Sequence, residues 1–75
     1  MLKSLAQFAP GESGIIREIH TETDYEARLR DYGMVVGTPI VCRYHSPGHH
    51  LLALECRGAV IALRKRDIEN ILVEI

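Results

Sequence analysis

The sequence has little of several residue types on which larger proteins depend. It contains no tryptophan, one phenylalanine, two cysteines and three prolines among 75 residues. A chain this short buries only about 60% of the surface that its unfolded form exposes, so it has room for one small core. A second domain, a transporter and an enzyme that encloses a large cofactor are excluded. We therefore expect residues 1–75 to form a single domain.

A strong charge of one sign and a long hydrophobic run are also absent. Nine Lys and Arg residues face ten Asp and Glu residues, for a formal net charge of −1. Nucleic-acid binders normally carry excess positive charge, so no nucleic-acid partner is expected. No apolar run approaches the roughly 20 residues that cross a bilayer, and residues 1–10 have no secretory signal pattern. These absences predict a cytoplasmic protein.

Short β-branched segments separated by glycines indicate a mainly β chain. Strands are expected at 14–19, 40–44, 51–56 and 59–63, and a short fifth strand near the C-terminus is expected to return beside the first. Before them, apolar residues at three-residue spacing predict a turn-like lead that packs on the core. These lead residues are Leu2, Leu5 and Phe8.

The three central strands can pair so that their apolar residues share one face. This register places Cys42 opposite Leu54 and Tyr44 opposite Leu52, and in the next hairpin it places Leu54 opposite Ile61. Cys42 and Cys56 then become diagonal neighbours at about 7–8 Å, which is too far for a disulfide. Both cysteines are expected to be small buried residues with free thiols.

One helix is expected between the first and second strands. Thr21 and Thr23 each precede a carboxylate residue by three positions, as an N-terminal capping hydroxyl does, and Gly33 is a typical C-terminal stop. Its apolar face is formed by residues at spacings of four and three, Tyr25, Leu29 and Tyr32. Farther on, Arg57-Gly58 predicts either a two-residue mirror-image turn, with Arg57 at positive φ, or a bulged turn with Gly58 left-handed.

These elements together favour a mainly β (small α+β) fold. Five short strands with one short helix between the first two suit an SH3-like, partly open five-stranded barrel, because curling the sheet buries one face and protects its edges. The alternative is an open sheet that the helix covers on one face.

Several segments, spread along nearly the whole chain, match one family. They are Ala9–Gly14, Arg28-Leu29, Tyr32–Met34, Gly37-Thr38, Arg57-Gly58 and Ile61–Arg64. Through them the chain resembles the FeoA domain, an SH3-like module of bacterial ferrous iron uptake. Two departures stand out. Val36 replaces the proline usual in the family, and residues 45–50 replace a hairpin that usually contains Leu-Gly-Asp-Pro.

The resemblance implies an accessory protein that binds FeoB, the membrane ferrous iron transporter with a cytosolic guanine-nucleotide-binding domain. It would modulate GTPase-coupled transport by protein contact, without being an enzyme, and would meet the membrane only through this partner. No oligomeric state is implied. The candidate partner-binding residues are Arg28, Tyr32, Met34, Arg57, Arg64 and Lys65.

Histidines in the replaced hairpin suggest an alternative function. Imidazole binds Zn²⁺ and Fe²⁺, so a metal-binding or metal-responsive protein could use His45, His49 and His50, with His20 as a further candidate. No complete zinc pattern is present, and an exposed polar loop is the plainer interpretation. No cofactor is expected to be required.

Catalytic patterns are missing. Ser46 lies near His45 and His49 in sequence, but no carboxylate accompanies them to complete a triad. Gly11 and Gly14 lack the further glycine, lysine and hydroxyl residue of a phosphate-binding loop. The sequence therefore predicts a protein that acts by binding and does not itself hydrolyse GTP.

Overall fold

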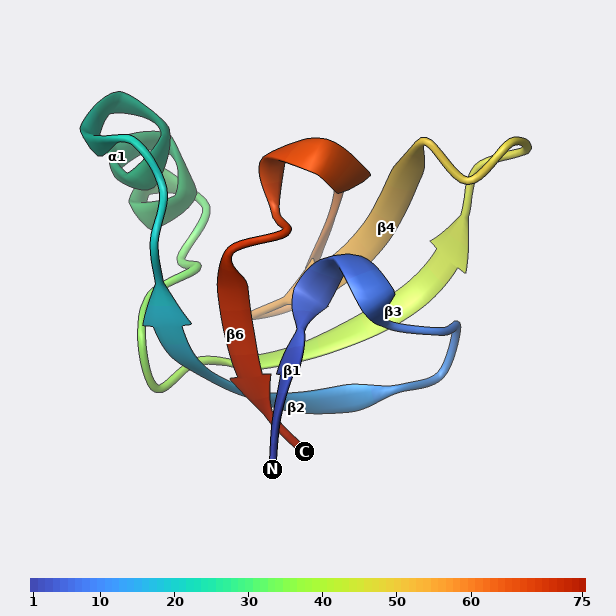
Figure 1. The fold of residues 1–75 in the computed structure, drawn as a ribbon, viewed down its shortest axis with the longest axis horizontal. Helices are drawn as coiled ribbons and strands as arrows, with labels where there is room; N and C mark the ends of the chain where they lie inside the picture. Colours follow the sequence, from blue (N-terminus) through green and yellow to red (C-terminus); the bar gives the residue numbers. More distant parts are fainter.

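The computed structural model describes all residues, 1–75, as one antiparallel sheet with a single α-helix (Figure 1). The strand order is β1-β6-β2-β3-β4-β5, and the edge strands β1 and β5 do not pair, so the sheet is not closed. The strands are β1 (Leu2–Ser4), β2 (Ser13–Ile19), β3 (Pro39–His45), β4 (Leu51–Cys56), β5 (Ala59–Arg64) and β6 (Ile71–Glu74). The helix α1 spans Thr23–Asp31, and two 3₁₀ turns, η1 and η2, span Leu5–Gln7 and Lys65–Asp67. The prediction of a mainly β fold is confirmed.

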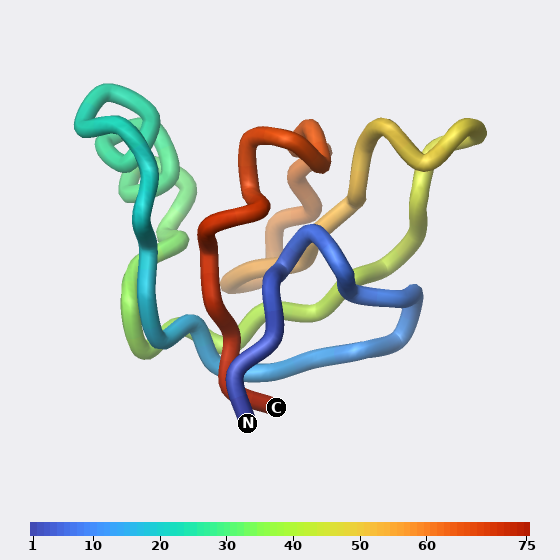
Figure 2. Tube along the Cα trace, viewed as in Figure 1, coloured from blue at the N-terminus to red at the C-terminus, as the bar shows by residue number.

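The number of strands was predicted one too low, because β1 was not expected. Its residues pair with the C-terminal strand, with Lys3 opposite Val73. Three residues are too few to show an alternating pattern, so only the pairing with β6 reveals the strand. The following η1 matches the expected turn-like lead for two of its three residues, because Leu5 and Phe8 are fully buried. The prediction that Leu2 packs on the core is wrong, since Leu2 lies in the edge strand β1 and is 42% exposed. The two termini lie side by side, as the trace in Figure 2 shows, and the Ile75 amide donates to the Met1 carbonyl at 3.1 Å.

Strand β2 is paired on both sides and joins the two halves of the sheet. Residues 13–15 pair with β3, whereas residues 15–19 pair with β6. The register with β6 shifts between Ile16 and Glu18, as at a β-bulge, where a strand bends and twists more strongly. The expected return of the last strand beside the first predicted strand is therefore confirmed.

The meander β3–β4–β5 follows the predicted register except at one point. Cys42 lies opposite Leu54 and Leu54 lies opposite Ile61, as expected. Between Cys42 and Tyr44 the register shifts, so that Tyr44 lies opposite Ala53 and not opposite Leu52. The prediction that Tyr44 shares the core face is wrong, because this irregularity leaves its side chain 60% exposed.

The turn between β4 and β5 is the tighter of the two alternatives. Cys56 pairs directly with Ala59, and both residues between them have positive φ, 54° at Arg57 and 83° at Gly58. These angles define the mirror-image two-residue turn, whose twist matches that of the flanking strands. Arg57 thus adopts a conformation that most residues avoid.

Glycine ends α1 in the way that the sequence predicted. Gly33 has φ +86°, and its amide donates to the Arg30 carbonyl at 2.9 Å. The Met34 amide donates to the Leu29 carbonyl, also at 2.9 Å, which completes a Schellman motif. This motif turns the chain from the helix toward β3.

The other end and the apolar face of α1 differ from expectation. Glu22 is the N-cap residue and makes no side-chain capping bond, so neither predicted threonine caps the helix. The Thr21 hydroxyl is buried without a hydrogen-bond partner. On the helix face Leu29 is fully buried and Tyr25 packs partly on the core, but Tyr32 remains 39% exposed. A nine-residue helix at one end of the sheet covers too little of it to bury all three residues.

The core collects residues from every strand except β1, together with η1, α1 and the segments after α1 and η2. Its members are Leu5, Ala6, Phe8, Ile16, Leu29, Met34, Ile40, Cys42, Leu52, Leu54, Cys56, Leu63, Ile68, Ile71 and Val73. None of the helices combines the length and the apolar character needed to span a membrane.

Gly14 allows the close approach of β2 and β6, which gives a first prediction. A Cβ atom at this position would lie 2.4 Å from the Glu74 carbonyl oxygen and 2.7 Å from Val73 Cγ1. We expect Gly14→Ala to lower the free energy of unfolding by about 3 kcal/mol in urea titrations, because backbone has to move.

Gly11→Ala is the matched control. Gly11 has φ +93°, and no atom lies within 4 Å of an added Cβ, so only the cost of the left-handed conformation applies, about 1–2 kcal/mol. If the two variants lost equal amounts of unfolding free energy, the close approach of β6 would not restrict the side chain at residue 14.

Candidate functional site

An open groove between α1 and the β5–η2 segment brings three of the predicted partner-binding residues together. Arg28 and Tyr32 come from the helix side, and Arg64 comes from the end of β5. The groove has a volume of about 650 Å³ and a mainly polar lining. The other lining residues are His20, Thr21, Glu22, Tyr25, Ala62, Leu63, Arg66, Asp67 and Asn70. We call this surface the helix groove.

Charges in the helix groove are mixed. Burial, and then the nearby Asp67 carboxylate, raise the pKa of Tyr25, so its phenol stays protonated. Neither Arg28 nor Arg64 is within ion-pair distance of a carboxylate of this chain. Both guanidinium groups are therefore free to pair with carboxylates of another molecule.

The other three predicted residues lie elsewhere. Met34 is only 1% exposed and belongs to the core, so it is not on any contact surface. Arg57 lies at the β4–β5 turn, and its side chain lies so close to Gly33 that an added Cβ there would be 2.8 Å from Arg57 Cδ. Lys65 lines a second groove of about 480 Å³ on the hairpin side.

The second groove lies beside the β3–β4 loop and, unlike the first, is mainly basic. Its residues are Gln7, His49, His50, Leu51, Arg64, Lys65, Arg66 and Glu69. Arg64 and Arg66 line both grooves, so residues 64–66 separate the two surfaces. We call this surface the hairpin groove.

The structure brings two of the three loop histidines together. The Nδ1 atoms of His45 and His49 are 3.0 Å apart, and their rings meet edge to face with centroids 5.2 Å apart. His50 lines the hairpin groove without a side-chain hydrogen bond to either. His20 lies in the helix groove and contacts Glu18 at 2.7 Å. No three His, Cys, Asp or Glu side chains converge as a metal site.

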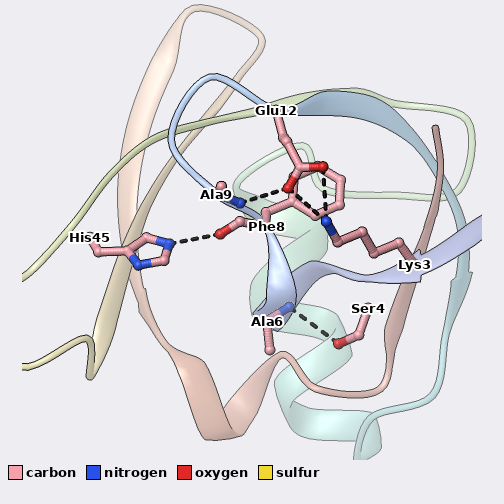
Figure 3. Close-up of polar contacts among 7 residues, drawn as sticks. All are labelled: Lys3, Ser4, Ala6, Phe8, Ala9, Glu12 and His45. Carbon is pink, nitrogen blue, oxygen red and sulfur yellow. Dashed lines mark hydrogen bonds and ion pairs between the residues drawn. The ribbon is translucent and has the colours of Figure 1, made fainter.

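A network around residues 3–12 holds His45 in place (Figure 3). His45 Nε2 donates to the Phe8 carbonyl at 2.7 Å. In the same segment, Glu12 accepts two bonds from Lys3, at 2.8 and 2.9 Å, and one from the Ala9 amide at 2.7 Å. The Lys3 ammonium also lies 5.7 Å from the centroid of the Phe8 ring.

Sequence reasoning missed this network. Lys3 and Glu12 are nine residues apart, and only the turn at Pro10 and Gly11 brings them together. The one available signal was Glu12 itself, a carboxylate within the Ala9–Gly14 segment that carries the family resemblance. The network ties the N-terminal segment to the end of β3 and so fixes the point where the β3–β4 loop begins.

Both cysteines are buried free thiols, as predicted. Burial raises the pKa of Cys42 and of Cys56, which disfavours the thiolate. The Cys56 Sγ lies 3.5 Å from the Gly33 carbonyl oxygen, as a weak donor. Neither residue has the exposed, thiolate-stabilising surroundings of a reactive cysteine.

The burial of the thiols predicts slow chemistry. Ellman's reagent should modify neither Cys42 nor Cys56 in the native protein and should modify both in denaturant, because access requires unfolding. Rapid native modification of one thiol would show that its position in the core is wrong.

The Lys3–Glu12 pair predicts a pH dependence. The Lys3 hydrogen bond and then the Ala9 amide hold the pKa of Glu12 below its usual value. A carboxylate with a lower pKa in the folded state stabilises the fold above its unfolded pKa, about 4.3, and this stabilisation is lost as the pH falls through the folded pKa. We therefore expect Glu12→Gln to flatten the decrease in unfolding free energy between about pH 5 and pH 3.

Glu69→Gln is the control for this measurement, since the Glu69 side chain is exposed and makes no ion pair. In this variant the unfolding free energy should fall with decreasing pH as steeply as in the wild-type protein. If Glu12→Gln also kept that slope, the ion pair would not contribute to acid stability.

Solved structures share this fold over nearly its full length. A FeoA-like protein from Clostridium acetobutylicum is 29% identical with a TM-score of 0.85, and the match covers 96% of this chain and 84% of that one. A crystal structure of an iron uptake regulatory protein (FeoA) is 21% identical with a TM-score of 0.86, covering 99% and 97%. The zinc complex of Stenotrophomonas maltophilia FeoA, described as a prokaryotic SH3 domain protein, is 21% identical with a TM-score of 0.78, covering 96% and 89%. The expected SH3-like architecture is confirmed, with a sheet that stays open.

The sequence comparison agrees with the structural one. None of the curated proteins matches the chain. The family model of the FeoA domain matches residues 3–75, which include all six strands and the helix, apart from the first residue of β1. The chain therefore belongs to the FeoA domain family, which is implicated in ferrous iron transport.

Proposed function

We propose that this protein is an accessory factor of ferrous iron uptake that binds the cytosolic part of a FeoB-type transporter and modulates its GTPase-coupled transport. The observation that carries the proposal is the match of the FeoA family model to residues 3–75. The S. maltophilia relative is itself described as possibly acting as a bacterial ferrous iron transport activating factor. In this account the chain acts by contact alone and catalyses no reaction.

The arrangement of polar groups supports a role in binding. The two thiols are buried, and Ser46 uses its hydroxyl to accept the Leu51 amide within its own loop at 3.0 Å. Nucleophilic catalysis needs an accessible nucleophile beside an oriented base. The surface instead carries two open grooves, lined by cationic side chains that form no ion pair.

The helix groove is the contact surface that we propose. Arg28, Tyr32 and Arg64 line it together, and Arg and Tyr are the residue types most enriched in the energetic centres of protein interfaces. The planar guanidinium of each arginine can hold a partner's carboxylate by two parallel hydrogen bonds. Lys65 and Arg57 would contribute at the margins of this surface, in the hairpin groove and at the β4–β5 turn.

A charge reversal in the helix groove tests this proposal. We expect Arg28→Glu and Arg64→Glu each to weaken binding to the detergent-solubilised transporter of the same organism by about tenfold or more, since a central interface arginine contributes more than 1 kcal/mol. Biolayer interferometry with immobilised full-length transporter would measure the dissociation constants.

Arg30→Glu is the matched control. Arg30 lies on the same helix and is exposed, but it does not line the helix groove, so its reversal should change affinity by less than about twofold. Absence of binding by the unmodified chain would contradict the proposed function. Binding that the Arg28 and Arg64 variants retain would contradict only the choice of surface.

A further inference from the structure

His45, at the end of β3, and His49, in the loop that follows, bring two imidazole nitrogens together. Partner binding through the helix groove does not use this pair. We propose that His45 and His49 form a two-imidazole site for a divalent first-row transition ion, bound through both Nδ1 atoms. The inference goes beyond the proposed function, because it needs no transporter and involves a different part of the chain.

Hydrogen bonding fixes the protonation of His45. The Phe8 carbonyl oxygen can only accept, so the His45 Nε2 atom at 2.7 Å must carry the proton. In the neutral ring the lone pair therefore belongs to Nδ1, which faces His49. Histidines that bind metals almost always donate their other N–H to a carbonyl or carboxylate, which orients the ring and raises its basicity. His45 thus already has the supporting contact of a metal ligand.

The distance between the two nitrogens suits a shared ion. Two nitrogens that each lie about 2.1 Å from a metal are about 3.0 Å apart at a 90° angle and about 3.4 Å apart at the tetrahedral angle. The observed Nδ1–Nδ1 distance is 3.0 Å. The separation matches an octahedral or square-planar ion, and a tetrahedral ion needs a few tenths of an ångström more. Both rings would still have to turn, because the two Nδ1 atoms now point at each other in a hydrogen bond and a shared ion, about 2.1 Å from each, would lie off the line between them.

A proton now occupies the position that the metal would take. Because His45 Nδ1 accepts, His49 Nδ1 donates in this contact. On metal binding the neutral His49 ring would move this proton to Nε2, and the number of protons on the pair would not change.

The hairpin loop holds His49 in position. The His49 amide donates to the Ser46 carbonyl at 2.9 Å, and the Ser46 amide donates to the Leu51 carbonyl at 2.9 Å. His49 itself has φ 61°, a left-handed conformation within this turn. The His49 ring is exposed but its backbone is held by these hydrogen bonds, so metal binding would cost little conformational entropy of the loop.

The remaining coordination positions would be filled by water. No third His, Cys, Asp or Glu side chain converges on the pair. Arg64, Lys65 and Arg66 line the same groove as His49, and their positive charge lowers the affinity for a cation. We therefore expect an exchangeable site of micromolar affinity for Zn²⁺, and for Fe²⁺ under anaerobic conditions.

Titration of the purified chain with Zn²⁺, followed by calorimetry and by the ¹⁵N shifts of the imidazole nitrogens, tests this site. We expect one equivalent to bind, with the Nδ1 resonances of His45 and His49 shifting together. His49→Ala should weaken binding at least tenfold while keeping the His45–Phe8 bond. His45→Gln should weaken binding to a similar extent, because it removes the other Nδ1 ligand.

His50→Ala and His20→Ala are the matched controls and should leave affinity within about twofold, because neither ring faces the pair. Unchanged affinity in His49→Ala would overturn the proposal. A loss in His50→Ala as large as that in His49→Ala would also overturn it, since the ion would then lie in the hairpin groove and not between the two Nδ1 atoms.

Discussion

The sharing of β2 between two neighbours is the constraint on which the rest of the structure depends. Its first residues pair with β3 and its later residues pair with β6. Within the segment that pairs with β3, Gly14 also lets the β6 backbone come closer than any side chain would allow. Without β2, the meander β3–β5 and the terminal pair β1–β6 would be separate small sheets, each with too little apolar surface to be stable alone. The 15-residue core forms because β2 joins them.

This arrangement also sets the positions of the proposed contact surface and the proposed metal site. The helix α1 and the tip of the β3–β4 hairpin lie at opposite ends of the long axis (Figure 1). The basic segment 64–66 lies between the helix groove and the hairpin groove, and two of its residues line both. The Lys3–Glu12 network anchors His45 from the far side of the hairpin. The proposed contact residues Arg28, Tyr32 and Arg64 and the proposed metal ligands His45 and His49 are therefore different side chains in different parts of the fold.

The sequence was sufficient where a pattern is local and regular. Alternation of apolar residues gave the β4–β5 register, and Gly33 marked the end of the helix through its left-handed conformation. The sequence was insufficient where tertiary contacts determine whether a strand forms or which way a side chain points. Strand β1 exists because β6 offers an edge, Tyr44 turns outward at an irregularity in β3, and the Thr21 hydroxyl is buried without capping the helix. For the site, local spacing identified the histidine loop, but only the fold shows that His45 pairs with His49 and that Met34 is buried.

The central claim is that this FeoA-family chain acts through its outer surface on the transporter. The most direct test is an NMR titration of the ¹⁵N-labelled chain with the cytosolic domain of FeoB in the GDP-bound and GTP-analogue-bound states. The account predicts that the largest amide shifts cluster along α1 and the end of β5, around Arg28, Tyr32 and Arg64, which line the same groove. Shifts confined to the β3–β4 hairpin, or no shifts at saturating concentrations, would contradict it.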